Sequence, residues 1–232
     1  MDHNYNLPTW ELLQKLLVWQ QLDFVHGKTV LDFGSGNGVT ADYFAENNRV
    51  TAIEPSSEML AQAVNRSGYT LMQGSLDRLK ELEVGSFDVI LCHNVLEYAR
   101  ERAGILCEFS RLLKQDGLLS ILKHNLNGRV MQMTVLLNNF DHARELLDGK
   151  NGASKDFGAI NYYDDGDLQL WCPDFQIVRT KGLRTFYDLQ QNQEIQSEAQ
   201  WQESMMDMER RVEDIPAFQN IAFFHHLLLK KR

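Results

Sequence analysis

The chain between Val30 and Gly38 reads Val-Leu-Asp-Phe-Gly-Ser-Gly-Asn-Gly, a short apolar strand that runs into a loop with glycine at every second position. Glycine has no Cβ, so this loop can turn sharply and allow a ligand to lie against the backbone. The residues from Val39 to Phe44 then open a helix, and the first amides of a helix can face the same ligand. The stretch predicts a nucleotide-type pocket at the carboxyl end of a strand.

A second strand supports this interpretation. Residues Arg49 to Ile53 are apolar and β-branched, and they end at Glu54, 22 positions after Asp32. An acidic residue about 20 positions on is where a Rossmann-like unit binds ribose, because a carboxylate accepts two hydrogen bonds from a cis-diol. We therefore expect Glu54 to contact a ribose, the alternative being a solvated charge at the end of a strand.

The glycine spacing distinguishes between two classes of ligand. A dinucleotide-binding fingerprint would place glycines at positions 34, 36 and 39, but position 39 is valine. Glycines at 34, 36 and 38 instead resemble the loop of class I S-adenosylmethionine-dependent methyltransferases. The resemblance implies S-adenosyl-L-methionine as cofactor and S-adenosyl-L-homocysteine as product. This cofactor has no phosphate, so Asp32 can order the turn and favour the cationic methionyl end.

Composition sets the broad class. The chain has 232 residues, 44% of them apolar, which is enough for the core of one domain. It contains no uncharged apolar run of about 18 residues and no signal pattern at its start, so we expect a cytoplasmic protein without membrane association. Three widely spaced cysteines predict small buried residues and no metal site; these are Cys92, Cys107 and Cys172.

The charge distribution bears on possible partners. The formal net charge of −9 argues against nucleic-acid binding through the whole surface. Residues 123–184, however, hold eight basic and eight acidic side chains, so a local basic face remains possible.

The order of elements predicts an α/β fold. Strands are expected near residues 30–33, 49–53, 69–72, 87–92, 118–122, 175–178 and 221–229, and helices alternate with most of them. A first helix is expected to begin at Thr9, its cap, and to carry Phe24 on its apolar face. Further helices are expected after Gly38, from Pro55 to Ala63, and from Ile105 to a turn at 115–117. Trp201, Met205, Met208 and Val212 form a stripe that we interpret as core.

Between strand five and strand six lie some fifty residues, too many for a structureless loop in a compact domain. Apolar residues from Val130 to Leu147 suggest a helix there. We expect one domain over residues 1–232, with an N-terminal helix within 1–27 and a lid or substrate cap at 125–172. The alternative for the insertion is a helix that only covers the edge of the sheet.

Later segments make the resemblance more specific. The stretch from Cys92 to Tyr98 resembles the motif after strand four in bacterial tRNA 5-carboxymethoxyuridine methyltransferases, and the segments 118–125, 138–141, 182–188 and 208–211 resemble that family too. The family implies a Rossmann-like, doubly wound sheet of seven strands with an antiparallel last strand. It also implies methyl esterification of the carboxylate on a modified wobble uridine, with tRNA as partner.

The resemblance also suggests site residues. The cofactor-binding residues it implies are Gly34, Ser35, Gly36, Glu54, Ser75, Leu76 and His93. To these we add Gln14, Asp32, Gly38 and Pro55 as candidates. Two positions depart from the family pattern: Gln14 replaces an arginine, and Lys123-His124 replaces an aromatic pair before Asn125.

For the acceptor, we expect Arg184, aided by Arg129 or Lys123, to orient an anionic group that Asn125 and Tyr187 position. A carboxylate acceptor is already ionised at pH 7, so the reaction needs no strong general base. Two alternatives remain: a methyltransferase acting on a small organic acid or hydroxyl, favoured by the acidic pI of about 5.2, and a non-catalytic cofactor-binding module. The sequence does not indicate an oligomeric state.

Overall fold

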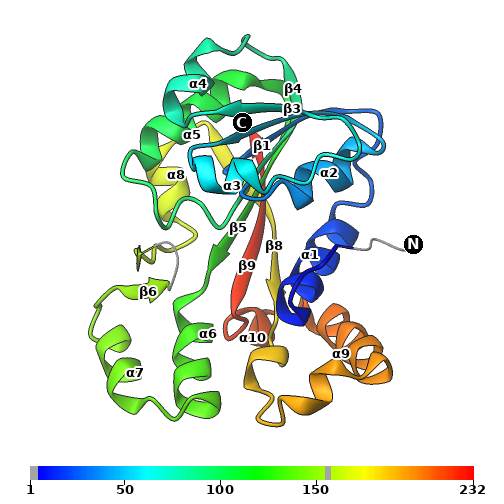
Figure 1. Cartoon of the computed structure of the whole chain (residues 1–232). Coiled ribbons are helices and arrows are strands. Elements are labelled where there is room, and N and C mark those ends of the chain that lie inside the picture. Colours follow the sequence, from blue (N-terminus) through cyan, green and yellow to red (C-terminus); the bar gives the residue numbers. More distant parts are fainter. Residues whose placement is uncertain (1–4, 155–157) are drawn as a thin grey trace. The chain divides into compact units, whose positions relative to one another are not determined.

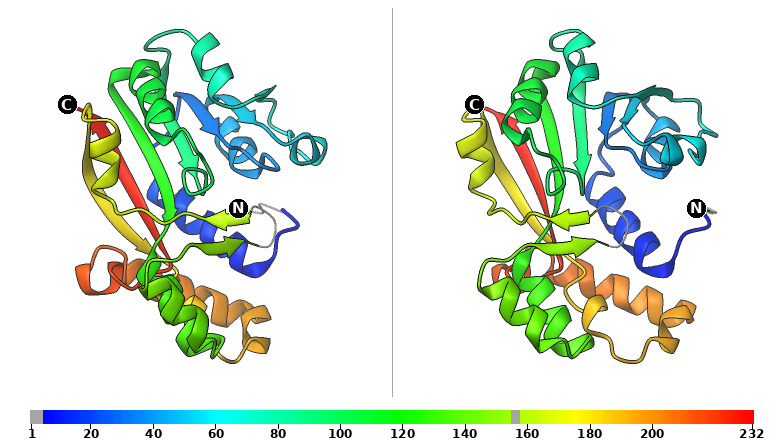
Figure 2. Two further views of the ribbon diagram at one scale, coloured as in Figure 1. Left: turned by 90° about the vertical axis from the view of Figure 1, so that its left-hand side faces the viewer. Right: turned by 60° about the vertical axis from the view of Figure 1, so that its left-hand side comes forward.

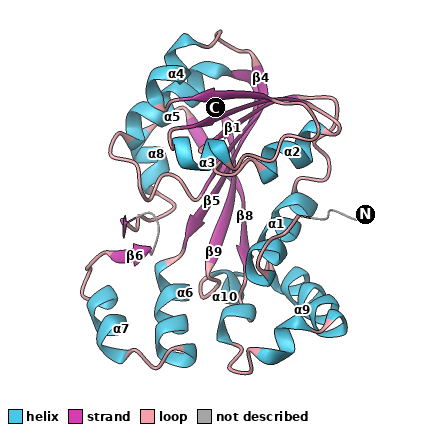
Figure 3. Cartoon of the chain, in the orientation of Figure 1, coloured by secondary structure: helices cyan, strands magenta, loops and turns pink. Residues whose placement is uncertain are grey.

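The computed structural model describes residues 5–154 and 158–232. Seven strands form one sheet in the order β3-β2-β1-β4-β5-β9-β8 (Figures 1 and 3). They are β1 (Thr29–Phe33), β2 (Arg49–Glu54), β3 (Thr70–Gln73), β4 (Phe87–His93), β5 (Leu113–His124), β8 (Phe175–Leu183) and β9 (Phe224–Lys231). The predicted α/β sheet is therefore confirmed.

The first five strands run parallel. β1 pairs with β2 and β4, β2 pairs with β3, and β4 pairs with β5. The last strand, β9, lies between β5 and β8 and gives the sheet its antiparallel part. This order makes the sheet a doubly wound, Rossmann-like one with the expected antiparallel last strand, and it puts the ends of β1, β2 and β4 side by side.

The described residues group into two compact units. The first comprises the residues up to Leu22 together with Lys123–Tyr162 and Thr180–His226, and the second comprises Asp23–Leu122, Tyr163–Arg179 and Leu227–Arg232. That residues 1–232 act as a single domain stays a prediction.

The second unit contains most of the sheet and its helices. These helices are α2 (Val39–Ala45), α3 (Ser57–Ala61), α4 (Leu76–Glu81), α5 (Arg102–Leu112) and α8 (Asp167–Trp171). Helix α5 packs against both α4 and α8 on one side of the sheet, and α2 lies on the other side (Figure 1). Because both faces are covered, central strand residues such as Leu31, Ile90 and Leu119 are fully buried.

The first unit is mainly helical. Its helices are α1 (Thr9–Gln21), α6 (Leu126–Met131), the π-helix η1 (Gln132–Leu136), α7 (Phe140–Leu147), the 3₁₀ turns η2 (Tyr187–Leu189) and η3 (Glu194–Ser197), α9 (Ala199–Val212) and α10 (Pro216–Gln219). Figure 2 shows the small antiparallel pair of β6 (Gly152–Ser154) and β7 (Gly158–Ile160). Met133, Ala143 and Leu146 form a small core between η1 and α7.

The insertion at 125–172 is helical over much of its length, as expected, because α6, η1 and α7 cover the apolar positions from Val130 to Leu147. Residues 155–157 lie outside the described part of the chain. The role of this insertion as a lid stays a prediction.

Several local expectations were wrong. The cap of α1 is Pro8 rather than Thr9, and the helix ends at Gln21, so Phe24 is 57% exposed instead of packed. The turn expected at 115–117 is a register shift inside β5, where the pairing jumps from Phe87↔Leu113 to Val89↔Leu118. The last strand begins at Phe224, three residues later than Ile221.

Two predictions of burial were also wrong in part. Cys92 and Cys172 are buried, but Cys107 is exposed, and its thiol is hydrogen-bonded to Cys172. Of the stripe on α9, Val212 is buried whereas Met208 is 46% exposed. The buried charged residue of that helix is Glu209, which the apolar pattern does not reveal.

Candidate active site

The glycine loop of the second unit has the backbone conformation that its sequence predicts. Gly34, Gly36 and Gly38 have φ angles of 75°, 56° and 76°, in the left-handed region that glycine tolerates best. Gly38 caps α2, and its carbonyl accepts from the amide of Asp42 at 2.8 Å. The loop therefore leads directly from the carboxyl end of β1 into a helix.

The three glycines have different surroundings. A Cβ on Gly34 would lie 2.3 Å from Cγ2 of Val95, and one on Gly38 would lie 1.9 Å from the hydroxyl of Tyr69. A Cβ on Gly36 would meet no atom within 4 Å. Gly34 and Gly38 thus allow the loop to pack on its own protein, whereas Gly36 borders open space that a ligand can occupy.

Glu54 holds the loop from the end of the neighbouring strand. Its Oε2 accepts from the amide of Gly36 at 2.8 Å, and its Oε1 accepts from the amide of Ser56 at 2.9 Å. The side chain is 7% exposed. Each carboxylate oxygen has a second lone pair, so Glu54 can fix the loop and still accept from a diol.

The end of β4 adds a polar group and a strained residue. Nε2 of His93 lies 2.8 Å from Oγ of Ser120, and the next residue, Asn94, has a φ of 56°. The buried Oδ1 of Asn94 and the buried Oγ of Ser35 have no hydrogen-bond partner among the described residues. Buried polar atoms without partners cost free energy, which marks both as candidates for ligand contacts.

The remaining cofactor candidates of the second unit lie near the same strand ends. Ser75 caps α4 and its amide donates to Oδ1 of Asp77 at 2.8 Å, a bond that lowers the pKa of the exposed Asp77 carboxyl. Leu76 opens α4 and packs against the core, while Pro55 is exposed at the end of β2. Asp32 is 2% exposed within β1. Burial raises the pKa of Tyr69 to about 12, and the Asp32 charge adds to the effect.

These residues fit an adenosylmethionine-type ligand. The open space at Gly36, the buried carboxylate of Glu54 and the unpartnered atoms of Ser35 and Asn94 supply a cradle for a polar, phosphate-free molecule. Gln14 is the exception among the candidates, because it belongs to the first unit, where its Oε1 accepts from Nη1 of Arg184 at 3.0 Å.

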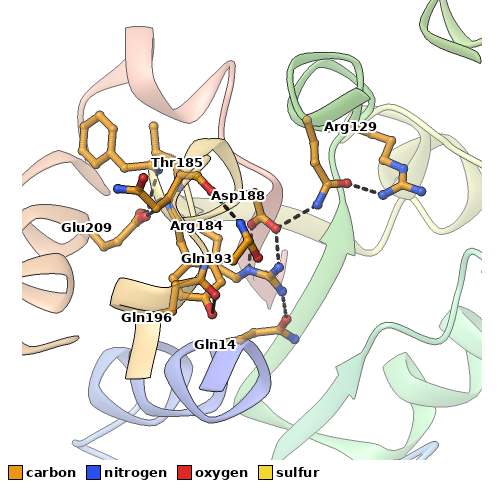
Figure 4. A network of polar contacts seen from close by, with 12 residues as sticks. Gln14, Arg129, Arg184, Thr185, Asp188, Gln193, Gln196 and Glu209 are labelled. Atoms are coloured by element: carbon orange, nitrogen blue, oxygen red, sulfur yellow. Dashed lines mark hydrogen bonds and ion pairs between the residues drawn. The ribbon is translucent and has the colours of Figure 1, made fainter. Parts of the chain in front are cut away.

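Arg184 is the centre of a polar network in the first unit (Figure 4). Its Nε donates to Oδ2 of Asp188 at 2.8 Å and its Nη2 to Oδ1 at 2.5 Å, a bidentate ion pair whose two side chains are each 6% exposed. Oδ1 of Asp188 also accepts from Nε2 of Gln132 at 3.0 Å, and Gln132 in turn accepts from Arg129.

Aromatic rings surround the same guanidinium. Cζ of Arg184 lies between 4.9 and 5.6 Å from the centroids of Trp10, Tyr187, Phe223 and Phe224. These rings attract a cation through their faces and exclude water from the ion pair. Together with polar side chains they line a pocket of about 350 Å³, whose walls are Trp10, His124, Gln132, Leu136, Arg184, Tyr187, Asp188, Gln193, Gln196, Phe223 and Phe224.

Glu209 of α9 fixes the backbone beside Arg184. Its Oε2 accepts from the amide of Thr185 at 2.7 Å, and its Oε1 accepts from the amides of Phe186 and Tyr187 at 2.9 and 3.0 Å. Burial raises the pKa of Glu209 and the three amide bonds oppose that shift. Arg184 itself has a φ of 57°, so these bonds hold a strained segment in place.

The other acceptor candidates lie in the first unit as well, but their contacts differ. Nδ2 of Asn125 donates to the carbonyl of Ala222 at 2.8 Å and to that of Asn220 at 3.1 Å, which is a structural role. Lys123 is 3% exposed. The hydroxyl of Tyr187 donates to Oε1 of Gln196 at 2.7 Å, at the wall of the pocket.

Sequence reasoning missed several residues of this pocket. Trp10, Phe223 and Phe224 had no motif to mark them, because only folding brings them to Arg184. Asp188 carried a signal that could have been used, since an acidic residue four positions after an arginine is a common ion-pair spacing.

No group of three or more potential metal ligands was found among residues 5–154 and 158–232. No helix in this part of the chain is both long and apolar enough to cross a membrane.

Comparisons with known proteins agree with the geometry. Residues 31–121 match a family model described as a methyltransferase domain. The chain is 27% identical over 218 residues to the tRNA 5-carboxymethoxyuridine methyltransferase of Escherichia coli (strain K12), covering 86% of this chain and 80% of that protein. It is 32% identical over 116 residues to the ubiquinone biosynthesis O-methyltransferase of Sodalis glossinidius, covering 47% of each chain.

Solved structures show the same fold. The PH0226 protein from Pyrococcus horikoshii OT3 matches with a TM-score of 0.62 at 12% identity, over 100% of this chain and 94% of that one. A 1,6-didemethyltoxoflavin-N1-methyltransferase from Burkholderia thailandensis matches with a TM-score of 0.54 at 16% identity, over 97% and 79% of the two chains. With the glycine loop and the acidic residue at the end of β2, these findings show a methyltransferase domain over residues 31–121 and a chain whose fold is that of S-adenosylmethionine-dependent methyltransferases.

Proposed function

We propose that this enzyme forms a methyl ester on the carboxylate of a modified wobble uridine in tRNA. The observation that carries the proposal is the extent of the similarity, because the tRNA enzyme of Escherichia coli aligns with 86% of the chain. The ubiquinone O-methyltransferase of Sodalis glossinidius aligns with 47%, little more than the part matched by the methyltransferase domain model.

For the cofactor, we propose that the second unit holds S-adenosylmethionine with the loop from Gly34 to Gly38, Glu54 and the polar residues at the ends of β3 and β4. Glu54 would accept from the ribose, and the Ser35 hydroxyl and the Asn94 amide would gain partners that they lack among the described residues. When bound, the cofactor supplies a methyl group on a cationic sulfur. Pro55, Ser75, Leu76 and His93 complete the proposed binding set, to which Asp32 adds a negative charge. Gln14 is a weaker candidate because it bonds Arg184.

For the acceptor, the protein has to align a carboxylate oxygen and exclude water. A carboxylate is ionised at pH 7, so none of the residues needs to remove a proton. Alignment at near-attack distance can contribute an effective molarity of roughly 10⁵ M or more. We assign the orientation of the anionic group to Arg184, with Arg129 and Tyr187 nearby, and Asn125 and Lys123 are proposed only as supports.

The test uses tRNA as the substrate. Purified enzyme is incubated with isotopically labelled S-adenosylmethionine and with total tRNA from cells whose gene for this enzyme is deleted, and the digested nucleosides are analysed by mass spectrometry. We expect a labelled methyl ester of a carboxylated uridine. Label on a different nucleoside, or none on tRNA in the presence of a competent cofactor, would contradict the proposal.

A second candidate acceptor is a small organic acid or hydroxyl compound. The net charge of −9 and the local similarity to the ubiquinone O-methyltransferases favour it. The same incubation with a metabolite extract in place of tRNA, followed by mass analysis for labelled products, separates the two candidates. A cytoplasmic location is proposed with either acceptor.

A further inference from the structure

The pocket of the first unit contains a charged group and its counter-ion, side by side. We propose that this pocket binds the planar, carboxylate-bearing ring of the acceptor, and that Asp188 is an internal counter-ion of Arg184 which the carboxylate of the acceptor displaces. The inference rests on the proposed function, because that function supplies an acceptor that is an acid before the reaction and an ester after it.

The backbone around the pocket departs from regular geometry, as is common at ligand-binding sites. Arg184 is a non-glycine residue with a φ of 57°, and such strain concentrates at binding and catalytic sites. Gln132 and Leu136, at the two ends of the π-helix η1, both line the pocket, and π-helical turns are frequent at functional sites. Two unrelated segments thus depart from regular geometry at one pocket.

The walls match a flat ring. Trp10, Tyr187, Phe223 and Phe224 contribute aromatic rings, and Gln193 and Gln196 contribute amide side chains. A heterocycle with oxo and N–H groups stacks on such rings and exchanges hydrogen bonds with amides. A pocket of about 350 Å³ lies within the size range of small-molecule sites and is large enough for one nucleobase with its substituent.

The hydrogen bonds of Arg184 show where a carboxylate would go. Arginine has five N–H donors, and Asp188 takes one from Nε and one from Nη2, while Gln14 takes one from Nη1. Asp188 therefore occupies the side-on edge of the guanidinium, which is the preferred bidentate edge for a carboxylate. At this edge, the carboxylate of the acceptor would take the place of the Asp188 carboxylate on Arg184.

Asp188 has a second hydrogen-bond partner besides Arg184, the side chain of Gln132. Its Oδ1 accepts from Gln132 at 3.0 Å, and Arg129 donates to the same Gln132, so the aspartate stays hydrogen-bonded when Arg184 turns to the acceptor. Methylation removes the charge of the acceptor, and an ester competes poorly for a guanidinium. Asp188 then pairs with Arg184 again, so the pocket binds the acid more tightly than the methylated product.

The test measures the affinity of the full-length enzyme for two matched ligands. The probes are 5-carboxymethoxyuridine and its methyl ester, each as the free nucleoside and as the modified residue of an anticodon stem-loop, titrated by calorimetry. We expect wild-type enzyme to bind the acid about tenfold more tightly than the ester, as a charge-assisted bidentate contact implies. Arg184→Gln should remove this preference.

Asp188→Asn is the decisive variant. Asparagine keeps the shape and one acceptor oxygen but removes the competing charge, so affinity for the acid should rise by about fivefold to tenfold while affinity for the ester stays the same. The unchanged ester affinity also shows that the pocket is folded. The matched control is Asp141→Asn, which removes the same charge from an exposed pair with Arg144 at 2.7 Å and should change neither affinity.

Three results would overturn the inference. Asp188→Asn could weaken acid and ester equally, which would make Asp188 a structural residue only. Wild-type enzyme could bind both ligands equally or bind neither at millimolar concentration. Trp10→Ala could leave the acid affinity unchanged, which would put the ligand elsewhere. Labelling of tRNA is measured separately, so acid-selective binding without tRNA methylation would disprove the proposed function and leave this inference standing.

Discussion

At the scale of single residues, Gly36 and Gly38 share a left-handed backbone but not a role. Gly36→Ala should cost about 1–2 kcal/mol from the backbone alone and weaken binding of S-adenosylhomocysteine, because its Cβ would enter open space at the proposed site. Gly38→Ala should destabilise the fold more, since its Cβ would lie 1.9 Å from the Tyr69 hydroxyl. Thermal unfolding and calorimetry of both variants check this. The assignment fails if Gly36→Ala binds the ligand as wild type does.

Glu209 gives a residue-scale prediction about pH. Its pKa in the folded chain is raised above the ordinary 4.5 by burial, so the folded state holds a proton more tightly than the unfolded state does. The stability of wild type relative to Glu209→Gln should therefore fall as pH rises from 4.5 through the raised pKa. Urea unfolding of both proteins at several pH values measures the difference. A difference that grows with pH would contradict the prediction.

Features that depend on residues close together in the chain could be predicted from the sequence, whereas contacts that form only on folding could not. The glycine loop and Glu54 could be predicted, because a turn, a strand end and a spacing of about 20 positions are local properties. The pocket could not, because Trp10, Arg184 and Phe223 are far apart in sequence. The contacts of Asn125 could not be predicted for the same reason, since its partners are backbone carbonyls of residues 220 and 222.

At the scale of elements, strand β9 is tied to helix α1 by a buried imidazole. Nδ1 of His226 lies 2.6 Å from Oε1 of Gln21, and burial, aided by the Lys181 charge, lowers the pKa of His226 from 6.5 to about 3. Below pH 6.5 the His226 side chain gains a proton in the unfolded chain, whereas it stays neutral in the folded chain. Stability should therefore fall as pH drops from 6.5 towards 3, by up to about 1.4 kcal/mol per pH unit from this group.

The comparison that isolates this group is His226→Gln, which keeps a side chain able to donate to Gln21. Urea unfolding between about pH 7 and pH 5 should show a shallower loss of stability in the variant than in wild type. If the stability of the two proteins fell equally with pH, the folded chain would protonate His226 as readily as the unfolded chain does, which would contradict the lowered pKa.

Elements were predictable where the pattern was strong. The parallel strands are nearly continuous apolar runs, and the structure places them within one or two residues of the expected ends for β1 to β4. The errors lie where polar residues obscure an element: the sequence predicts a turn from Gln115 to Gly117, but this segment belongs to β5. The cap of α1 was misplaced by one residue because Pro8 and Thr9 both suit a helix start.

At the scale of the whole molecule, the charge of the acceptor determines how strongly salt should change the KM of the enzyme. A tRNA substrate releases counterions on binding, so its KM should rise roughly tenfold or more between about 50 and 200 mM salt if about three phosphates are contacted. A small acidic acceptor should change far less. Steady-state rates at several salt concentrations with each substrate check this, and a KM for tRNA that is insensitive to salt would favour the small-molecule acceptor.

The place of β9 in the sheet has a consequence for synthesis. This strand comes last of the seven along the chain, yet it lies between β5 and β8, so neither of those strands has its full set of backbone partners until residue 231 has emerged from the ribosome. Until then two unpaired strand edges are exposed, a state prone to aggregation. We expect nascent chains of this enzyme to depend on chaperones until β9 is available for pairing, and variants truncated before Phe224 to accumulate in inclusion bodies.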